Sequence, residues 1–271
     1  MSNFWKRVLS GGIFVAAVVA TIFASPPCFY ALFLFFIVVG IAEHGQMARR
    51  IDARVNIPLC ASCGALLFTA GFLHNHGGER YVNLYLLLLL LLSLLPVVEL
   101  YRKQGSGFRN IAFSFHALFY IALPFTLLTY IPYRVTGEWT PSIVFLPFLL
   151  VWVNDTFAYL SGVCLGRHKL FPRVSPNKSW EGFAGGSIAT LATGAWVAPL
   201  VEGLTRTDTV IISCLVVIFA VYGDLIESLF KRDVNVKDSG NLLPGHGGIL
   251  DRLDALLFTI PAIFVYLEWK Y

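Results

Sequence analysis

The chain contains nine apolar stretches, each about as long as a helix needs to cross a bilayer. The hydrocarbon core of a membrane is about 30 Å thick, and a helix spans it with roughly 20 residues. The stretches lie near residues 8–24, 27–42, 57–73, 81–100, 111–131, 142–164, 182–201, 209–230 and 252–268. We therefore expect an all-α, polytopic integral membrane bundle with about nine transmembrane helices.

Composition and local pattern exclude two other classes of protein. Apolar residues make up 57% of the 271 residues and charged residues only 13%, whereas soluble domains carry about 25% charged residues. A soluble globule with this composition would expose too much apolar surface to water. The strands of a membrane β-barrel alternate apolar and polar residues, but residues 86–92 are seven consecutive leucines.

The distribution of Lys and Arg predicts the orientation of the chain, because these residues concentrate in cytoplasmic loops. If the N-terminus is cytoplasmic, all but four of the 20 Lys and Arg residues lie on the cytoplasmic side; the exceptions are Arg80, Arg134, Arg206 and Lys270. The net charge of +4 then means a basic cytoplasmic face, which suits lipid or nucleotide phosphates. The loops near 43–56 and 101–110 are interpreted as ordinary basic connections.

No soluble domain is visible, because the longest loops have about 10–20 residues. We expect an N-terminal region of about five spans, residues 1–141, and a C-terminal region, residues 142–271, that carries the chemistry. Any active site is therefore expected at the cytoplasmic membrane surface or inside the bundle.

The end of the eighth stretch and the start of the ninth carry an unusual set of charges. On a helix, Asp224, Glu227, Ser228 and Lys231 share one face, because they are spaced by three or four residues. Asp251 and Asp254 share a face in the same way. Ionisable residues in a membrane helix are costly unless they face a partner, an ion or water, so we expect such a partner here.

The residue types of this segment predict metal-assisted phosphate chemistry. Carboxylates that converge from two helices make a hard oxygen site, and Mg²⁺ typically takes one or two carboxylates together with substrate phosphates. Cations for the phosphate oxygens are Lys231, Arg232, Lys237 and Arg252. Glycines that allow close approach of a polyanion before a helix start are Gly245, Gly247 and Gly248. The structural alternative is a glycine turn with internally paired salt bridges.

A second polar cluster lies in and after the sixth stretch. Asn154 and Asp155 interrupt an apolar helix, and the run at 175–182 follows with Ser175 and Lys178. A carboxylate near bilayer depth favours a functional or paired role for Asp155. Within the same run, Ser179, Glu181 and Gly182 are typical of residues at the start of a helix, here the seventh span.

Three runs in the C-terminal half resemble one known family. The run at 228–254, which we call the signature run, is similar to the signature of the phosphatidate cytidylyltransferases, or CDP-diacylglycerol synthases. The runs at 154–159 and 175–182 also resemble that family. The resemblance implies an integral membrane enzyme of phospholipid biosynthesis that uses Mg²⁺ to join CTP and phosphatidate, giving CDP-diacylglycerol and pyrophosphate. By resemblance, Asp224 and Asp251 stand at the positions of metal-binding aspartates.

The reaction that the resemblance implies needs cations more than a covalent catalyst, because two polyanions must meet. The expected metal ligands are Asp224 and Asp251. The expected catalytic residues are Lys231, Arg232, Lys237, Asp238, His246 and Arg252, with His246 either donating to the leaving pyrophosphate or structuring its loop. The expected substrate-binding residues are Asn154, Asp155, Ser175, Lys178, Gly245, Gly247 and Gly248.

The expected partners are CTP and a phosphatidate lipid in the bilayer, with no nucleic acid and with a homodimer as the expected assembly. The expected location is a bacterial inner membrane with the active site facing the cytoplasm, where CTP is found. Two alternatives stay open. A CTP-dependent lipid kinase would transfer the γ-phosphate, and a membrane solute transporter would also place carboxylates inside a bundle.

Overall fold

The computed structural model describes residues 3–103, 106–242, 245 and 247–271 of the chain. The chain divides into two compact units, each of which is described by itself. Unit 1 consists of Met1–Tyr130 and Asp233–Leu253, and unit 2 consists of Ile131–Arg232 and Asp254–Tyr271. The signature run therefore contributes residues to both units, and the first division of the chain falls at 130/131, compared with the boundary at 141/142 expected from the sequence.

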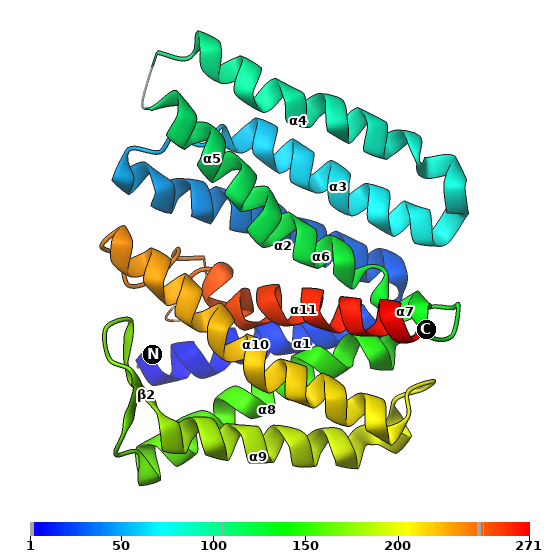
Figure 1. Cartoon of the computed structure of the whole chain (residues 1–271), viewed down its shortest axis with the longest axis vertical. Helices are drawn as coiled ribbons and strands as arrows, with labels where there is room; N and C mark the ends of the chain where they lie inside the picture. The colour runs from blue at the N-terminus through cyan, green and yellow to red at the C-terminus, as the bar shows by residue number, and fades with distance from the viewer. Residues whose placement is uncertain (1–2, 104–105, 243–244, 246) are drawn as a thin grey trace. The chain divides into compact units, whose positions relative to one another are not determined.

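Unit 1 is a bundle of helices in which α2, α3 and α4 are successive neighbours (Figure 1). Its elements are α1 (Asn3–Ala24), α2 (Pro26–Ala48), η1 (Arg49–Ile51), α3 (Ile57–Gly77), η2 (Gly78–Tyr81), α4 (Asn83–Tyr101), α5 (Gly107–Ala117), η3 (Leu118–Ala122) and α6 (Leu123–Leu128). The segment 233–253 adds a loop and the first turn of α11 (Leu250–Lys270).

Local sequence explains where the helices of unit 1 begin and change form. Ser25 caps α2 by accepting a hydrogen bond from the Cys28 N–H, and prolines occupy the first two helical positions, where a missing N–H costs nothing. The π-helical turn η3 comes just before Pro124. A proline cannot donate to the carbonyl four residues back and its ring crowds that carbonyl, so a local widening of the helix relieves the conflict.

Unit 2 combines long helices with one small hairpin. Its elements are α7 (Ile131–Arg134), α8 (Pro141–Leu165), β1 (Lys169–Phe171), β2 (Ser175–Ser179), α9 (Trp180–Val197), η4 (Ala198–Leu200), α10 (Arg206–Asp233, whose last residue belongs to unit 1) and α11 from Asp254 onward. The strands β1 and β2 pair antiparallel. The all-α fold is confirmed, and this hairpin is an addition that the helical pattern did not predict.

Helices α8 and α9 pack against each other more closely than ordinary side chains allow (Figure 1). The buried face of α9 carries a small residue every fourth position: Gly182, Gly186, Thr190 and Gly194. A Cβ atom at Gly182 would lie 2.7 Å from the Ala158 carbonyl oxygen. Small residues allow two membrane helices to approach in this way, so this stripe fixes α8 and its polar residues against α9.

One buried carboxylate, that of Asp208, joins the start of α10 to the end of α11. Asp208 and Thr205 cap the start of α10 reciprocally. The Asp208 carboxylate also accepts hydrogen bonds from Tyr266, Lys270 and Tyr271 at the end of α11. The hydrogen bond to Asp208 raises the pKa of the Lys270 ammonium group.

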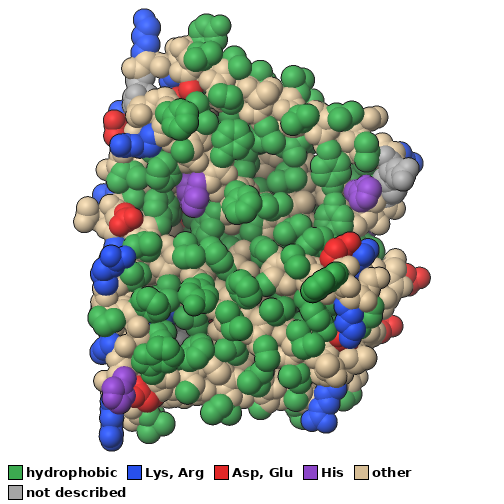
Figure 2. All heavy atoms as spheres, in the orientation of Figure 1, with side chains coloured by type: hydrophobic (Ala, Val, Ile, Leu, Met, Phe, Trp, Pro, Cys, Tyr) green, Lys and Arg blue, Asp and Glu red, His purple; other side chains and the backbone are tan. Residues whose placement is uncertain are grey.

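Seven helical segments of the described chain are long and apolar enough to cross a membrane. They are Pro26–Ile51, Ile57–His76, Asn83–Tyr101, Gly107–Arg134, Pro141–Leu165, Trp180–Leu200 and Arg206–Asp233. The other two expected spans differ from these: the apolar helix Leu9–Ala24 is shorter, and α11 carries charged residues near both of its ends. Figure 2 shows hydrophobic side chains over the helices of both units. The protein is a multi-pass membrane protein.

Candidate active site

Unit 2 contains a cavity of about 480 Å³ that is lined by α8, β1, β2, α9 and α10. Four of the site residues expected from the sequence line it: Asn154, Asp155, Lys178 and Asp224. They come from three separate runs of the chain. The cavity also has an apolar side, where Tyr159 and Val163 are 71% and 68% exposed on the surface of the unit.

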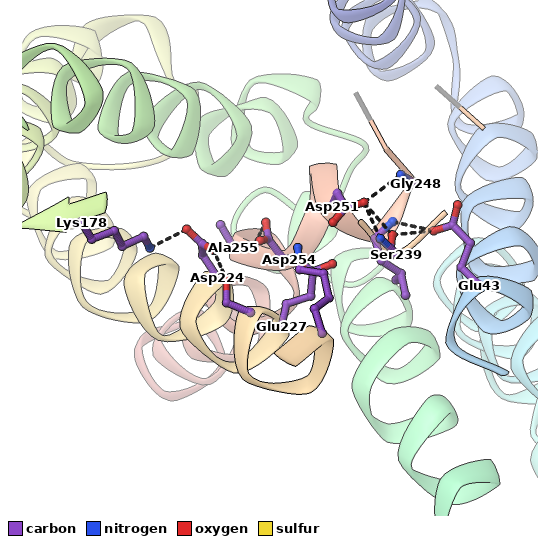
Figure 3. A network of polar contacts seen from close by, with 12 residues as sticks. Glu43, Lys178, Asp224, Glu227, Ser239, Gly248, Asp251, Asp254 and Ala255 are labelled. Carbon is purple, nitrogen blue, oxygen red and sulfur yellow. Dashed lines mark hydrogen bonds and ion pairs between the residues drawn. The ribbon is translucent and has the colours of Figure 1, made fainter. Parts of the chain in front are cut away.

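An ion pair crosses this cavity from the hairpin to α10 (Figure 3). The Lys178 Nζ lies 2.5 Å from Asp224 Oδ2. Both side chains are about one third exposed or less, at 26% and 37%, so solvent reaches the pair. Asp224 Oδ1 also accepts a hydrogen bond of 3.1 Å from the Ser228 hydroxyl one turn later. An ammonium group beside a partly exposed carboxylate is a suitable place for a phosphate or a metal ion to bind.

The expected charged face of α10 is confirmed. Lys231 donates to Glu227 at 2.8 Å, and the Glu227 side chain is fully buried. Asp254 on α11 forms a side-chain hydrogen bond with Glu227 and interacts electrostatically with Asp224 and Asp155. Unit 2 therefore gathers four acidic side chains, Asp155, Asp224, Glu227 and Asp254, with Lys178 paired to Asp224 and Lys231 paired to Glu227.

One glycine explains why α10 and α11 come close enough for this cluster to form. A Cβ atom at Gly223 would lie 2.5 Å from the Asp254 carbonyl oxygen and 3.0 Å from the Ala255 Cα atom. Backbone therefore packs on backbone at this point. The residue after Gly223 is Asp224, and Glu227 is one turn later, so both carboxylates are brought beside Asp254 (Figure 3).

The hairpin that carries Lys178 is fixed at both of its ends. Ser179 caps α9 by accepting a 3.1 Å hydrogen bond from the Gly182 N–H, which confirms the expected helix start. Glu181 accepts hydrogen bonds from the N–H groups of Arg167 and His168 and from His168 Nδ1. The Trp180 N–H donates to the His168 carbonyl. These bonds close the loop before β1 onto the start of α9 and turn the segment into a hairpin.

In unit 1, the signature run folds around the carboxylate of Asp251 (Figure 3). Asp251 Oδ2 accepts hydrogen bonds from the Ser239 N–H at 2.8 Å, the Ser239 hydroxyl at 2.9 Å and the Gly248 N–H at 2.8 Å. Gly247 adopts a positive φ of 82°, and a Cβ atom there would lie 2.4 Å from Asp251 Oδ2. Glycine is therefore required at 247 both for its backbone conformation and for the space that it leaves.

The remaining expected site residues have different surroundings. Ser175 lies at the start of β2 and does not line the cavity described above. Arg232, Lys237, Asp238 and Arg252 are exposed, as is Gly245, whereas Gly248 is buried and its N–H is used by Asp251. His246 lies outside the described residues, so its role stays a prediction.

One buried acidic residue of this region, Glu43, was not predicted from the sequence. Glu43 on α2 is 6% exposed and accepts hydrogen bonds from Ser239, Ile249 and Leu250 in the signature run. The interpretation of 43–56 as an ordinary basic connection was wrong for this residue, because Glu43 is still inside a helix and buried. The cost of a carboxylate in an apolar helix, the argument applied to Asp155, would have identified it.

The donor chemistry of both regions fits a hard cation such as Mg²⁺. Among the described residues, no group of three or more His, Cys, Asp or Glu side chains is arranged to hold a metal ion. Mg²⁺ does not require such a group, because it commonly takes one or two carboxylates and completes its shell with phosphate oxygens and water. Asp224 is 37% exposed and lines the cavity of unit 2, so a cation can reach its carboxylate oxygens.

Comparison with known proteins agrees with the resemblance seen in the signature run. Residues 5–269 match the Cytidylyltransferase family. The chain is 33% identical to a phosphatidate cytidylyltransferase of Haemophilus influenzae over 94% of its own length and 96% of that protein. Similar proteins of the same name occur in Staphylococcus saprophyticus (40% identity; 61% and 62% of the two chains) and Staphylococcus haemolyticus (35%; 79% and 80%). The chain therefore belongs to the cytidylyltransferase family.

Proposed function

We propose that this protein is a phosphatidate cytidylyltransferase, which converts CTP and phosphatidate to CDP-diacylglycerol and pyrophosphate. The family match covers nearly the whole chain, and relatives named for this activity include one that is similar over 94% of it. In this reaction a phosphate oxygen of the lipid forms a bond to the α-phosphorus of CTP. The bond from that phosphorus to the β-phosphate oxygen breaks, and pyrophosphate carries the electron pair away.

The lining of the cavity in unit 2 supports the proposal at the level of individual residues. The runs at 154–159 and 175–182 and the residues just before the signature run are far apart in sequence, yet each of them contributes residues to the lining of the cavity of unit 2. A scaffold or a simple basic loop gives no reason for Asp155, Lys178 and Asp224 to converge. Convergence of acid, base and amide groups in one cavity is typical of a binding site.

Within this cavity, Lys178 is the proposed phosphate-binding residue. Its ammonium group is 2.5 Å from the Asp224 carboxylate, and the Lys178 side chain is partly exposed. The ammonium group can therefore bind a phosphate oxygen in place of the carboxylate without leaving a buried position. Asn154 and Asp155 line the same cavity and are proposed to orient the polar part of a substrate. Ser175, on the same hairpin, remains a proposed substrate-binding residue.

The proposed cofactor is Mg²⁺, and Asp224 in unit 2 and Asp251 in unit 1 are each proposed as metal ligands. This assignment rests on the sequence resemblance and on the oxygen donors of the two carboxylates. A bound Mg²⁺ would polarise phosphate oxygens and reduce the repulsion between the two anionic substrates. The protein's own part is to hold each carboxylate: Ser228 does this for Asp224, and Ser239 and Gly248 do it for Asp251.

The remaining cations and the loop residues are assigned from their charge. Lys231, Arg232, Lys237 and Arg252 are proposed to neutralise the attacking and leaving phosphates, with Asp238 orienting them. Gly245, Gly247 and Gly248 are proposed to let a phosphate approach the loop, and His246 to donate to pyrophosphate. A strong general base is not required, because a phosphate monoester is largely deprotonated near pH 7.

The apolar side of the cavity suits a lipid substrate. Tyr159 and Val163 line the cavity and are also largely exposed on the surface. In a membrane protein, exposed aliphatic and aromatic side chains face acyl chains rather than water. We propose that the phosphate of the lipid reaches Lys178 while its acyl chains stay over these residues. A cytoplasmic site in a bacterial inner membrane and a homodimer, which crosslinking in native membranes would detect, are also proposed.

Labelled CTP tests the reaction against the alternatives. The purified protein in phosphatidate-containing nanodiscs with Mg²⁺ is expected to transfer label from the α-phosphate of CTP to a chloroform-soluble lipid and to release the γ-label as pyrophosphate. Transfer of the γ-label to the lipid, with CDP as the second product, would instead identify a lipid kinase. Solute uptake into liposomes without CTP turnover would identify a transporter.

A further inference from the structure

The side chain of Glu43, on α2, accepts hydrogen bonds from three residues of the signature run. Its Oε1 accepts the Ile249 N–H at 3.0 Å, and its Oε2 accepts the Leu250 N–H at 3.0 Å and the Ser239 hydroxyl at 3.2 Å. Leu250 is the first residue of α11. Glu43 therefore supplies, from another helix, the negative charge that the start of α11 favours.

The same serine connects Glu43 to the proposed metal ligand. The Ser239 oxygen lies 3.2 Å from Glu43 Oε2 and 2.9 Å from Asp251 Oδ2 (Figure 3). A serine hydroxyl has one proton to donate, and both neighbours are carboxylate oxygens. Ser239 is thus held between two acceptors, and the position of the Glu43 carboxylate affects how the hydroxyl is directed toward Asp251.

Two glycines of the loop are explained by the space that Glu43 occupies. A Cβ atom at Gly240 would lie 2.5 Å from Glu43 Oε1, and one at Gly248 would lie 2.4 Å from Glu43 Oε2. Any side chain at either position would displace the carboxylate or the loop. Gly248 is also the residue whose N–H donates to Asp251, so the same close packing serves both carboxylates.

We propose that Glu43 is a positioning residue that fixes the signature loop and, through Ser239 and Gly248, the orientation of the Asp251 carboxylate. The proposal rests on the proposed function of Asp251 as a metal ligand. Asp251 is the second residue of α11, so whatever holds Ile249 and Leu250 also holds Asp251. A simple structural cap would stabilise the helix, but it would not set how Asp251 binds a cation.

The expected effect is therefore on metal binding more than on folding. Residues that orient a metal ligand typically change metal affinity or activity by about 10–100-fold when they are replaced. In Glu43→Gln, one acceptor oxygen becomes an NH₂ group that faces an N–H or hydroxyl donor. The loop must move to relieve that conflict, and the donors to Asp251 move with it.

A matched control is available in the same unit. Glu99 is another buried glutamate, which accepts from Arg102 and Asn110 and makes none of the signature-loop contacts described above. Glu43→Gln and Glu99→Gln remove the same charge from similarly buried positions. Glu43→Asp keeps the carboxylate on a shorter side chain, and Ser239→Ala removes the shared hydroxyl while keeping the backbone contacts of Glu43.

The experiment measures binding of Mn²⁺ to the full-length protein in nanodiscs, with CTP present and phosphatidate absent, by electron paramagnetic resonance. Glu43→Gln is expected to raise the Kd for Mn²⁺ at least tenfold, with Glu43→Asp and Ser239→Ala intermediate and Glu99→Gln within twofold of wild type. Amide exchange at Ile249 and Leu250 is expected to accelerate only in the Glu43 variants. In turnover assays, the Mg²⁺ concentration for half-maximal activity should rise in the same order.

Equal Kd values for Mn²⁺ in Glu43→Gln and Glu99→Gln would overturn the proposal. It would also be overturned if Glu43→Gln lowered only the amount of folded protein and left the Mg²⁺ concentration for half-maximal activity unchanged. If Glu43→Gln does not fold, an unchanged Kd in Ser239→Ala overturns it as well. Failure of the proposed function looks different: wild-type protein would then make no CDP-lipid, while the Mn²⁺ data would still separate the Glu43 and Glu99 variants.

Discussion

The two units hold their carboxylates with different kinds of donor. In unit 1, the hydrogen bonds described for Glu43 and Asp251 come from backbone N–H groups and from the Ser239 hydroxyl. In unit 2, Asp224 and Glu227 are instead paired with the ammonium groups of Lys178 and Lys231. Figure 3 shows the Lys178–Asp224 pair and the contacts that Ser239 makes with Glu43 and Asp251.

The difference separates two tasks that a phosphate-transfer site must perform. Neutral donors fix the direction of a carboxylate and leave its charge for a cation. An ammonium partner neutralises the carboxylate, but it can also turn to a phosphate, for which it is equally complementary. We therefore expect the neutral-donor network to control metal binding and the lysine-paired network to control substrate binding and stability.

The largest effect is expected from Asp251→Asn. The side chain keeps its size, but it loses the negative charge that the proposed metal requires, and one of its oxygens becomes a donor. Loss of a charge-stabilising group of this kind costs about 10²–10³ in kcat. The rate at which the purified protein forms CDP-lipid measures this loss in kcat. The variant should still insert and remain folded, as judged by its elution in size-exclusion chromatography, and activity near the wild-type value would remove Asp251 from the metal site.

The next effect is on stability and comes from Lys231→Met. Glu227 is fully buried and next to Asp254, so loss of its lysine partner leaves excess negative charge in a buried place. Breaking one side of a buried ion pair costs about 3 kcal/mol or more. The thermal midpoint in detergent should fall clearly. The double variant Lys231→Met/Glu227→Gln should recover most of the loss, and equal midpoints for the single and double variants would contradict this account.

How far the sequence predicts these networks depends on the range of the contacts. The face with Asp224, Glu227 and Lys231 was predictable because helical spacing alone places residues four apart together. The cap at Ser179 was predictable because serine is a preferred residue directly before the start of a helix. The contact of Glu43 with Ile249 joins residues 206 positions apart, and no local period encodes it. The hairpin at 169–179 depends likewise on the Glu181 carboxylate, whose partners lie on the far side of the loop.

A smaller effect, on substrate affinity, is expected from Lys178→Gln. The variant loses the ammonium group 2.5 Å from Asp224, so we expect the KM for phosphatidate or CTP to rise about tenfold, the equivalent of about 1.4 kcal/mol, with a smaller change in the Mg²⁺ requirement. Lys169→Gln on the neighbouring strand is the control, because Lys169 is exposed and does not line the cavity. If the two variants raise KM equally, general surface charge and not the cavity attracts the substrate.

The smallest effect is expected from Arg134→Gln, which removes an exposed ion pair, in contrast to the buried Lys231–Glu227 pair. Arg134 lies 2.7 Å from Glu268, a shorter distance than in the Lys231–Glu227 pair, but both side chains are well exposed at 37% and 47%. Exposed pairs contribute about 0–1 kcal/mol because water and salt screen them. The thermal midpoint should therefore change little, and less still in high salt. A loss as large as that of Lys231→Met would mean that proximity, and not burial beside other carboxylates, determines what an ion pair contributes in this protein.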